Sequence, residues 1–388
     1  MIEAHYRQVR ARSLALAAPL SDEDCAAQSM ADASPVKWHL AHTTWFFETF
    51  VLERHEAGFR PFHPAFRMLF NSYYNGVGER HPRAARGLLT RPSMAEVRAY
   101  RADVDQRMLT LLNVQGDSDA ALVQLASLGL QHEQQHQELM LTDVLHLLSA
   151  NPLLPAYDSA APQAAARPGA MEWCSFDGGL VEIGHEGDGF CFDNELPRHR
   201  QYLAPYQLAT RLVSNGDFLA FMDDGGYRNP ALWLAEGWDV VCRERLSHPL
   251  YWRYDDNDGW RKFSLRGEQS LDLAQPACHL SLYEAAACAA WMGARLPTEG
   301  EWEAGAASPG LDDLSGPCWQ WTSSSYAPYP GYASAPGALG EYNGKFMLNQ
   351  YVLRGASLAT PEGHARRSYR NFFPAATRWQ FTGVRLAR

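Results

Sequence analysis

Two histidines, His132 and His136, are four residues apart in the segment LGLQHEQQHQELMLTDVLHLL. The segment contains no glycine or proline after Gly129, and its apolar residues recur at helical spacing, so we expect a helix. Side chains at positions i and i+4 lie on one face of a helix. Both imidazoles can therefore bind the same metal ion.

A third ligand is available upstream, in the segment SPVKWHLAHTTWFFETF. On a helix, His42 shares a face with Trp38 and Trp45, whereas His39 lies on the face of Thr43. Each histidine could point inward, or could simply pack among core aromatic side chains, so spacing alone does not choose between them. Three neutral imidazoles would leave a divalent metal its full charge and open positions for a substrate and oxygen.

The sequence HEQQH also matches the HExxH pattern of zinc metalloproteases, in which the glutamate is the general base. On this alternative hypothesis Glu133 would activate water in a zinc hydrolase. A protease also needs a third ligand, usually downstream. His146 lies ten residues beyond His136, too far along the helix axis to share the metal. We expect His146 to be a buried or capping histidine.

The elements that must position these histidines belong to a helical first half. Helical periodicity covers residues 3–18, 35–57, 93–114 and 118–149. Ser34-Pro35 has the pattern of an N-cap followed by proline at the first helical position, and Ser93 precedes another helix start. Four helices of this length predict a bundle.

A connector and a second domain follow the bundle. Residues 151–170 are rich in proline and alanine and show no amphipathic period, as expected of a linker. Beyond them, short strand-like runs such as GGLVEIG and YQLATRLV alternate with turn residues, and one helix is expected at about 281–292. We therefore predict a helical domain at 1–150 that carries the metal ligands and an α+β domain at 171–388.

Composition excludes several classes of function. The net charge of -10 argues against nucleic acid or an anionic membrane as the partner. No stretch approaches a transmembrane helix, and the amino-terminal residues lack the apolar core of a signal peptide, so we expect a cytoplasmic protein. The seven cysteines never form a CxxC pair, which predicts free thiols and no cysteine-ligated metal.

A series of ordered motifs resembles the ergothioneine sulfoxide synthase family (EgtB-type) and its close relatives, the selenoneine synthases (SenA-type). The motifs include SPVKWHLAHTTWFFETF, LFNSYYNGVGERHPRAARGLLTRP, HEQQHQELMLTDVLH, DNELPRHR, RLPTEGEWE and YRNFFPAATRWQFTGVRLAR. The resemblance runs almost end to end. It implies an amino-terminal DinB-like four-helix bundle and a carboxy-terminal domain like the formylglycine-generating enzyme, with a C-type-lectin-like fold. Within RLPTEGEWE we expect Arg295, Glu299, Glu301 and Trp302 to have structural roles.

The same resemblance implies a three-histidine Fe(II) site. The family's first ligand comes from the motif matched here by LAHTTW, which selects His42 over His39, and His132 and His136 match the other two. The implied substrates are O2, hercynine (the trimethylated betaine of histidine) and a sulfur or selenium donor. The implied reaction forms a bond from sulfur or selenium to imidazole C2 of hercynine.

Further site residues follow from the resemblance. A phenol near the metal can give a proton or an electron to reduced oxygen, and Tyr73 and Tyr74 in NSYYN match tyrosines that are catalytic in one branch of the family. The quaternary ammonium of hercynine calls for aromatic faces, and its carboxylate calls for amide donors. The positions implied for hercynine are Gln135, Asn371, Phe372 and Phe373.

The identity of the donor is the open question. Arg83 and Arg86 are candidates to pair with donor carboxylates, as arginines do in branches that use cysteine or γ-glutamylcysteine. This chain departs from the usual ergothioneine pattern at Gln320, where glutamate is common, and lacks an acidic residue at Asn371-Phe372-Phe373. A selenosugar lacks amino-acid charges and would need less ionic recognition. The departures therefore favour a selenoneine synthase, with an ergothioneine sulfoxide synthase as the alternative and a zinc hydrolase as a distant one.

Overall fold

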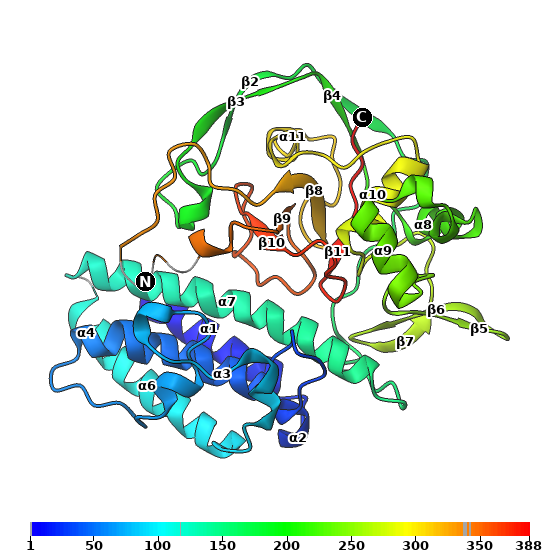
Figure 1. Cartoon of the computed structure of the whole chain (residues 1–388). Helices are drawn as coiled ribbons and strands as arrows, with labels where there is room; N and C mark the ends of the chain where they lie inside the picture. Colours follow the sequence, from blue (N-terminus) through cyan, green and yellow to red (C-terminus); the bar gives the residue numbers. More distant parts are fainter. Residues whose placement is uncertain (1, 117, 337–339, 341–342) are drawn as a thin grey trace. The chain divides into compact units, whose positions relative to one another are not determined.

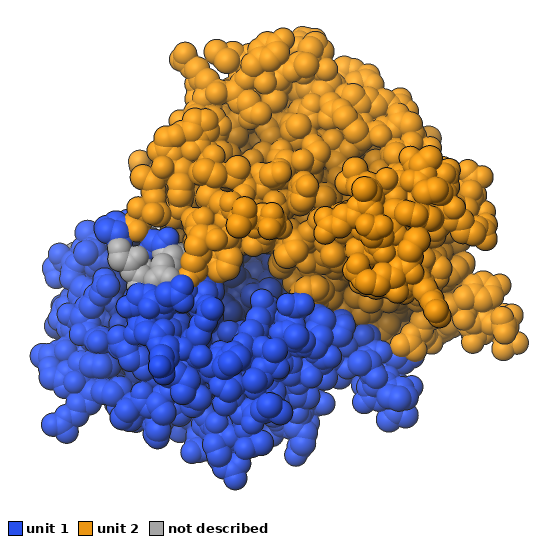
Figure 2. Space-filling view, viewed as in Figure 1, with its two compact units in different colours: residues 1–159, 336–341, 359–364 blue, residues 160–335, 342–358, 365–388 orange. Residues whose placement is uncertain are grey.

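The computed structural model describes residues 2–116, 118–336, 340 and 343–388. The chain divides into two units, coloured separately in Figure 2. Unit 1 consists of residues 1–159, 336–341 and 359–364, and unit 2 of residues 160–335, 342–358 and 365–388. The division between residues 159 and 160 lies within the segment that we predicted as a connector. That residues 359–364 group with the helical unit was not anticipated from the sequence.

Unit 1 is helical, and α1, α3, α6 and α7 pack against one another as its main helices (Figure 1). Its elements are α1 (Ile2–Ala17), α2 (Asp22–Ala26), α3 (Val36–Phe46), the π-helix η1 (Phe47–Leu52), α4 (Glu53–His55), α5 (Phe66–Leu69), the 3-10 helices η2 (Asn75–Val77) and η3 (Arg83–Leu88), α6 (Met94–Gln115) and α7 (Ala120–Ser149). The four predicted helical segments are confirmed; the second of them continues from α3 through η1 into α4.

The two predicted helix starts had different outcomes. Ser93 is the N-cap of α6 and forms a capping box with Glu96, as its position indicated. The prediction for α3 was wrong by one residue: Pro35 is the N-cap, and the helix begins at Val36. Ser34 instead lies outside the helix, where its backbone N–H donates to the carboxylate of Asp143 at 2.8 Å. A tertiary hydrogen bond has thus replaced the local cap.

Helix α3 lies at the centre of the bundle, and all of its residues are buried. A helix that is buried on every side must contact neighbours on every side. Its continuation η1 approaches α7 closely at Gly129, where an added Cβ would lie only 2.6 Å from Phe47. This close approach explains why glycine occupies a helix interior, where it is otherwise unfavourable.

A buried ionic cluster joins the four main helices at one point. Glu133 of α7 is wholly buried and accepts hydrogen bonds from Arg10 of α1 at 2.8 Å and Arg101 of α6 at 2.9 Å. Both guanidinium groups also donate to the hydroxyl of Thr44 on α3, at 3.0 and 3.3 Å. Ser13 of α1 donates at 2.6 Å to Oε1 of Glu133, the same oxygen that accepts from Arg101. The cluster therefore specifies how the helices are rotated relative to one another.

Unit 2 is an α+β domain of short strands. The strands are β1 (Trp173–Phe176), β2 (Gly179–Ile183), β3 (His199–Leu203), β4 (Tyr206–Ala209), β5 (Trp252–Asp255), β6 (Gly259–Ser264), β7 (Gly267–Ser270), β8 (Trp319–Ser325), β9 (Tyr351–Arg354), β10 (Asn371–Phe373) and β11 (Thr382–Gly383). A four-stranded sheet has the order β10-β9-β8-β11, with only β8 and β11 parallel. The remaining strands form the pairs β1-β4 and β2-β3 and the antiparallel sheet β5-β6-β7 (Figure 1).

Helices and turns complete unit 2. They are α8 (Asn215–Asp223), α9 (Ala235–Glu244), α10 (Leu282–Trp291), α11 (Glu299–Gly305) and the 3-10 helices η4 (Asp193–Glu195), η5 (Gly226–Arg228), η6 (Pro230–Leu232) and η8 (Gly344–Phe346). The predicted helix near 281–292 is α10, and GGLVEIG contains β2, so both predictions are confirmed. The alternation of short strands and turns in this half is also as expected.

The RLPTEGEWE segment has structural roles, as expected. Thr298 caps α11 and forms a capping box with Glu301. The Glu301 carboxylate also receives two hydrogen bonds of 2.7 Å from Arg295. Glu299 lies at the start of α11, where it accepts hydrogen bonds from Arg370 at 2.9 and 3.0 Å.

Gln320, one of the departures from the usual family pattern, is a packing residue in the core of unit 2. It is fully buried, and its side-chain oxygen accepts hydrogen bonds from Trp302 at 2.6 Å and Arg385 at 2.8 Å. Its side-chain nitrogen donates to the backbone oxygen of Asp313 at 2.8 Å. Because its polar atoms are used within the fold, Gln320 does not support a changed donor pocket.

Two expectations about the whole chain can be compared with the structure. All seven cysteines are free thiols, as predicted. Among the described residues, no helix is long and apolar enough to cross a membrane.

Candidate metal centre

Three histidines of unit 1 converge on one point. His42 comes from α3, and His132 and His136 come from α7, which packs against α3. One ring nitrogen from each lies within 4.8 Å of the others, and the Nε2 atoms of His42 and His132 are 3.2 Å apart. The three residues are only 0%, 1% and 8% exposed. Among the described residues, these three histidines are the histidine, cysteine or carboxylate side chains whose ligand atoms lie close enough together to hold a metal ion.

His42 is held in place on several sides. Its Nδ1 donates to the backbone oxygen of Phe70 at 2.6 Å, which leaves Nε2 with the lone pair that faces His132. The ring is stacked between two indoles: the centroid of Trp38 is 4.5 Å away at 13°, and that of Trp45 is 5.5 Å away at 19°. The orientation of this ligand is therefore built into the apolar core.

His39, the other candidate for the third ligand, contacts His136 of the histidine cluster instead. Its Nδ1 lies 2.8 Å from Nδ1 of His136, and its Nε2 lies 3.0 Å from the carboxylate of Asp143. The structure therefore groups His42, and not His39, with His132 and His136. His146, expected to be buried or capping, is partly buried and bonds through its ring nitrogen to Ser29 at 2.7 Å.

Burial keeps the three imidazoles neutral. Desolvation lowers the pKa of His132 to about 3, and it lowers the pKa values of His42 and His136 well below their ordinary 6.5. Neutral imidazoles are the form that binds a metal. Nε2 of His42, which carries a lone pair, lies 3.2 Å from Nε2 of His132, so a bound cation could accept a lone pair from each of these rings. The donor set therefore fits a divalent transition metal, and nitrogen ligands disfavour magnesium or calcium.

Glu133, the possible base of an HExxH hydrolase, is not available for that role. Both of its carboxylate oxygens are bound in the cluster with Arg10, Arg101 and Ser13. The two arginines overcome the effect of burial and lower its pKa from 4.5 to about 2. A general base near neutral pH needs a pKa closer to 7. The glutamate in HEQQH is a structural ion-pair residue.

Tyr74, but not Tyr73, is wholly buried. Its ring lies 5.6 Å from Trp45, which in turn stacks on His42, and 5.1 Å from Phe50. The rings of Tyr73 and Tyr74 stack at 4.6 Å, and their hydroxyl oxygens are 3.5 Å apart. Tyr74 thus packs in the aromatic layer next to the histidine cluster, and the part-exposed Tyr73 contacts it.

Arg83 and Arg86 differ in their surroundings. Arg83 is exposed on η3. Arg86 is buried, with its guanidinium 3.3 Å from the ring centre of Trp38, and it donates to the hydroxyl of Ser34 at 2.8 Å. Of these two candidates for pairing with donor carboxylates, Arg86 already uses its guanidinium within the fold. Trp38 also stacks on His42. Arg86, Trp38 and His42 therefore form one row of stacked side chains.

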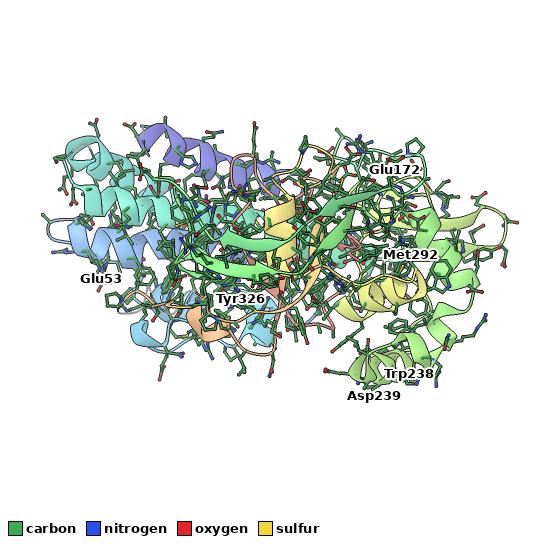
Figure 3. All side chains as sticks on the ribbon, turned by 90° about the horizontal axis from the view of Figure 1, so that it is seen from above. Glu53, Glu172, Trp238, Asp239, Met292 and Tyr326 are labelled. Atoms are coloured by element: carbon green, nitrogen blue, oxygen red, sulfur yellow. The ribbon has the colours of Figure 1, made fainter. Side chains whose placement is uncertain are left out.

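The other candidate substrate residues lie in two units. Gln135 is part-buried on α7, next to His136. Asn371, Phe372 and Phe373 form β10 in unit 2. The ring of Phe372 stacks at 4.0 Å on that of Tyr326, which is labelled in Figure 3. The amide oxygen of Asn371 accepts a hydrogen bond from the backbone N–H of Phe372 at 2.9 Å.

Sequence reasoning missed the residues that orient the ligands. Asp143, Phe70 and Ser34 contact these histidines or their partners, but none of them was predicted from the sequence to have a role at the site. Asp143 was detectable in principle, since it lies seven residues, about two helical turns, beyond His136 on the same helix. The backbone oxygen of Phe70 had no signal, because any residue supplies one.

Comparisons with known proteins cover the whole chain. Residues 5–140 match the DinB superfamily, and residues 158–310 and 306–388 match the sulfatase-modifying factor enzyme 1-like domain. These matches confirm the predicted fold class of a DinB-like helical domain followed by a C-type-lectin-like domain of the formylglycine-generating-enzyme type.

Curated proteins are similar to this chain over its whole length or over part of it. "Hercynine oxygenase" of Mycobacterium tuberculosis is 30% identical over 434 residues, covering 100% of this chain and 98% of the relative. "Hercynine oxygenase" of Mycolicibacterium smegmatis is 31% identical over 410 residues and covers 91% of each chain. "Formylglycine-generating enzyme" of Thermomonospora curvata is 30% identical over 177 residues, covering 42% of this chain and 57% of that enzyme.

The structural role of Glu133 can be tested with Glu133→Gln. We expect the free energy of unfolding at pH 7 to fall by about 3–5 kcal/mol, because two buried guanidinium groups lose their counter-charge. Because folding lowers the pKa of Glu133 from 4.5 to about 2, its ionised carboxylate contributes about 3 kcal/mol to the stability of the wild type above pH 4.5. This contribution is lost as the pH falls from 4.5 towards 2. The variant should lack that part of the pH dependence. Denaturant unfolding at several pH values measures both effects.

Glu53→Gln is the matched control, because its partner Arg67 and Glu53 itself are 49% and 39% exposed. It should change the unfolding free energy by less than about 1 kcal/mol. Unchanged stability in Glu133→Gln, together with loss of a hydrolytic activity, would contradict the structural role and restore the hydrolase hypothesis.

Proposed function

The chain belongs to the hercynine oxygenase family, and from this premise we propose that it is an iron(II)- and O2-dependent oxidoreductase that joins selenium or sulfur to hercynine. The bond forms at imidazole C2. The observation that carries the proposal is the buried cluster of three neutral imidazoles in the DinB-like unit. No carboxylate belongs to this cluster among the described residues, so a bound ferrous ion would keep its charge and attract an anionic thiolate or selenolate.

His42, His132 and His136 would hold the iron, which supplies O2 binding and electron transfer when bound. With a thiol donor, hercynine, the thiol and O2 give a sulfoxide and water. The imidazole C2–H and the thiol S–H bonds break, a C–S bond forms, one oxygen atom goes to sulfur and the other leaves as water. The chain's own residues orient the reactants and manage the protons.

Tyr74 and Tyr73 are proposed to supply a proton during this reaction. Tyr74 is buried beside Trp45 in the aromatic layer that holds His42, a place where a phenol is shielded from bulk water. The hydroxyl of Tyr73 is 3.5 Å from that of Tyr74. A proton given by the buried phenol can therefore be replaced through the part-exposed one.

Gln135, Asn371, Phe372 and Phe373 are proposed to bind hercynine. Amide groups can bond to its carboxylate, and aromatic faces attract its quaternary ammonium. The proposal for these residues rests on their match to family motifs and on their chemistry. Their exposure supports it, since all four are only part-buried and so keep surface that a ligand can contact.

The donor is proposed to be a selenosugar, with cysteine or γ-glutamylcysteine as the alternative. Arg86 supports this choice, because its guanidinium is committed to Trp38 and Ser34. Of the two candidate arginines, only Arg83 is exposed to pair with a donor carboxylate. A donor without amino-acid charges needs fewer such pairs.

The iron proposal predicts the behaviour of ligand variants. After anaerobic loading with Fe(II), the wild type should hold iron and convert hercynine in an O2-dependent reaction, whereas His42→Ala, His132→Ala and His136→Ala should lose bound iron and activity. Metal analysis and mass spectrometry of the product measure these outcomes. His146→Ala is the matched control on α7 and should keep both. Zinc in the native protein with O2-independent activity would overturn the proposal.

Tyr74→Phe should lower the rate of C–Se or C–S bond formation by about 10²–10⁴-fold, the usual contribution of a positioned acid. Tyr73→Phe should have a smaller effect, since it only resupplies the proton. The ratio of coupled product to O2 consumed, measured by mass spectrometry and an oxygen electrode, should fall for Tyr74→Phe as donor oxidation takes over. Full coupled activity in both variants would exclude the tyrosines as proton donors.

A competition between donors tests the choice of branch. Hercynine, Fe(II) and O2 are incubated with a 1-seleno-sugar, cysteine or γ-glutamylcysteine, and kcat/KM is measured for each by mass spectrometry. We expect the highest value for the selenosugar. For Arg83→Ala we expect little change with the selenosugar and a loss of about tenfold or more with γ-glutamylcysteine, since one charged hydrogen bond contributes about 1.5–3 kcal/mol. A higher value for either amino-acid donor would assign the chain to ergothioneine synthesis.

A further inference from the structure

His39 lies between the metal-site residue His136 and the carboxylate of Asp143, and no part of the proposed function uses it. We propose that Asp143 and His39 are positioning residues that determine which nitrogen of His136 faces the metal. This inference rests on the metal-binding part of the proposed function and does not depend on the identity of the substrates.

The direction of the hydrogen bonds follows from the carboxylate. Oδ2 of Asp143 receives the backbone N–H of Ser34 at 2.8 Å and lies 3.0 Å from Nε2 of His39. An ionised carboxylate can only accept hydrogen bonds, so Nε2 of His39 must carry the proton. In a neutral imidazole the other nitrogen, Nδ1, is then an acceptor. It lies 2.8 Å from Nδ1 of His136, which must therefore be the donor.

The tautomer of His136 is thereby assigned. With its proton on Nδ1, the lone pair is on Nε2, the nitrogen that remains to join the cluster of His42 and His132. His42 is arranged in the same way, because its Nδ1 donates to the backbone oxygen of Phe70 at 2.6 Å. Two ligands thus use Nδ1 for an outer hydrogen bond and keep Nε2 for the metal, the arrangement that outer-layer partners impose on metal-binding histidines.

Asp143, His39 and His136 form a hydrogen-bonded row, which we call the relay. Burial allows the relay to control the tautomer of His136. The side chains of His39 and Asp143 are only 3% and 6% exposed, so water cannot substitute for either one. Without an acceptor beside Nδ1, His136 could place its proton on Nε2. An N–H would then point at the other two imidazoles and exclude a metal. The charge of Asp143, transmitted through His39, also makes His136 a stronger donor to a cation.

The relay continues outward to Arg86. Ser34, whose N–H binds Asp143, accepts a hydrogen bond from Arg86 through its hydroxyl at 2.8 Å. The Arg86 guanidinium also covers Trp38, which stacks on His42. Arg86 therefore supports two of the three ligands by separate routes. Burial lowers the pKa of Arg86 to about 8, and the charge of Asp143 opposes this shift.

The tautomer can be read directly in the metal-free protein. Two-dimensional ¹⁵N NMR of protein labelled at histidine nitrogens distinguishes Nδ1–H from Nε2–H imidazoles. We expect wild-type His136 as Nδ1–H, with its signals assigned by their loss in His136→Asn. In His39→Phe, which removes the acceptor, we expect a mixture of tautomers. A wild-type His136 in the Nε2–H form would overturn the proposal.

Metal affinity provides the second measurement, with Fe(II) alone under anaerobic conditions and a competing chelator. His39→Phe and Asp143→Leu should weaken binding by about 10–100-fold, the usual effect of removing an outer-layer partner. His39→Gln should restore most of the affinity, because its amide can accept from His136 and donate to Asp143. His146→Phe, on the same helix as His136, is the matched control and should bind as the wild type does.

These measurements distinguish a relay that sets the tautomer of His136 from a general structural role of His39. They also test the relay independently of the proposed substrates. If His39→Phe does not fold, the wild-type tautomer and His39→Gln still decide the question. Wild-type affinity in a folded His39→Phe, or His39→Gln as weak as His39→Phe, would contradict the relay. Absence of hercynine turnover in a wild type that shows the Nδ1–H tautomer and binds Fe(II) would contradict only the proposed substrates.

Discussion

The buried ion pairs of Glu133 are the interaction on which the position of the three-histidine cluster depends. Arg10 of α1 and Arg101 of α6 bind this carboxylate from α7, and both also bond to Thr44 on α3. A single hydrogen-bonded cluster therefore connects four helices. Consecutive residues of a helix point about 100° apart, so directing Glu133 into this cluster also directs His132 to a different side. The rotation of α7 is specified in the core, where an unpaired charge would be very costly.

The chemistry of the site follows from that rotation. His132 and His136 meet His42 of α3 in an interior that excludes water, and desolvation keeps all three imidazoles neutral. Stacking on Trp38 and Trp45 orients His42. Nδ1 of His42 is bonded to the backbone oxygen of Phe70, and Nδ1 of His136 to His39. The proposed metal would require little rearrangement of these side chains, because the fold already orients the three imidazoles.

The same structure explains why HEQQH is not a protease motif here. The pattern specifies two histidines and a glutamate on one helix but not the partners that each side chain meets. In this chain the glutamate meets two guanidinium groups, which remove its ability to act as a base near neutral pH. Likewise, Arg86 belongs to a motif with an expected substrate role, yet it packs on Trp38 and binds Ser34. The chemistry of such groups is decided by their neighbours.

The sequence by itself determined the four helices, the change to an α+β second half and the i, i+4 pair of His132 and His136, because periodicity and spacing are local properties. Motif order added the family and favoured His42. Only the tertiary structure decided that His39 binds His136, that Glu133 is an ion-pair residue and that Arg86 is buried. It also decided that residues 359–364 group with the helical unit. These outcomes depend on how helices distant in sequence are rotated and packed, and a local pattern carries no information about that rotation.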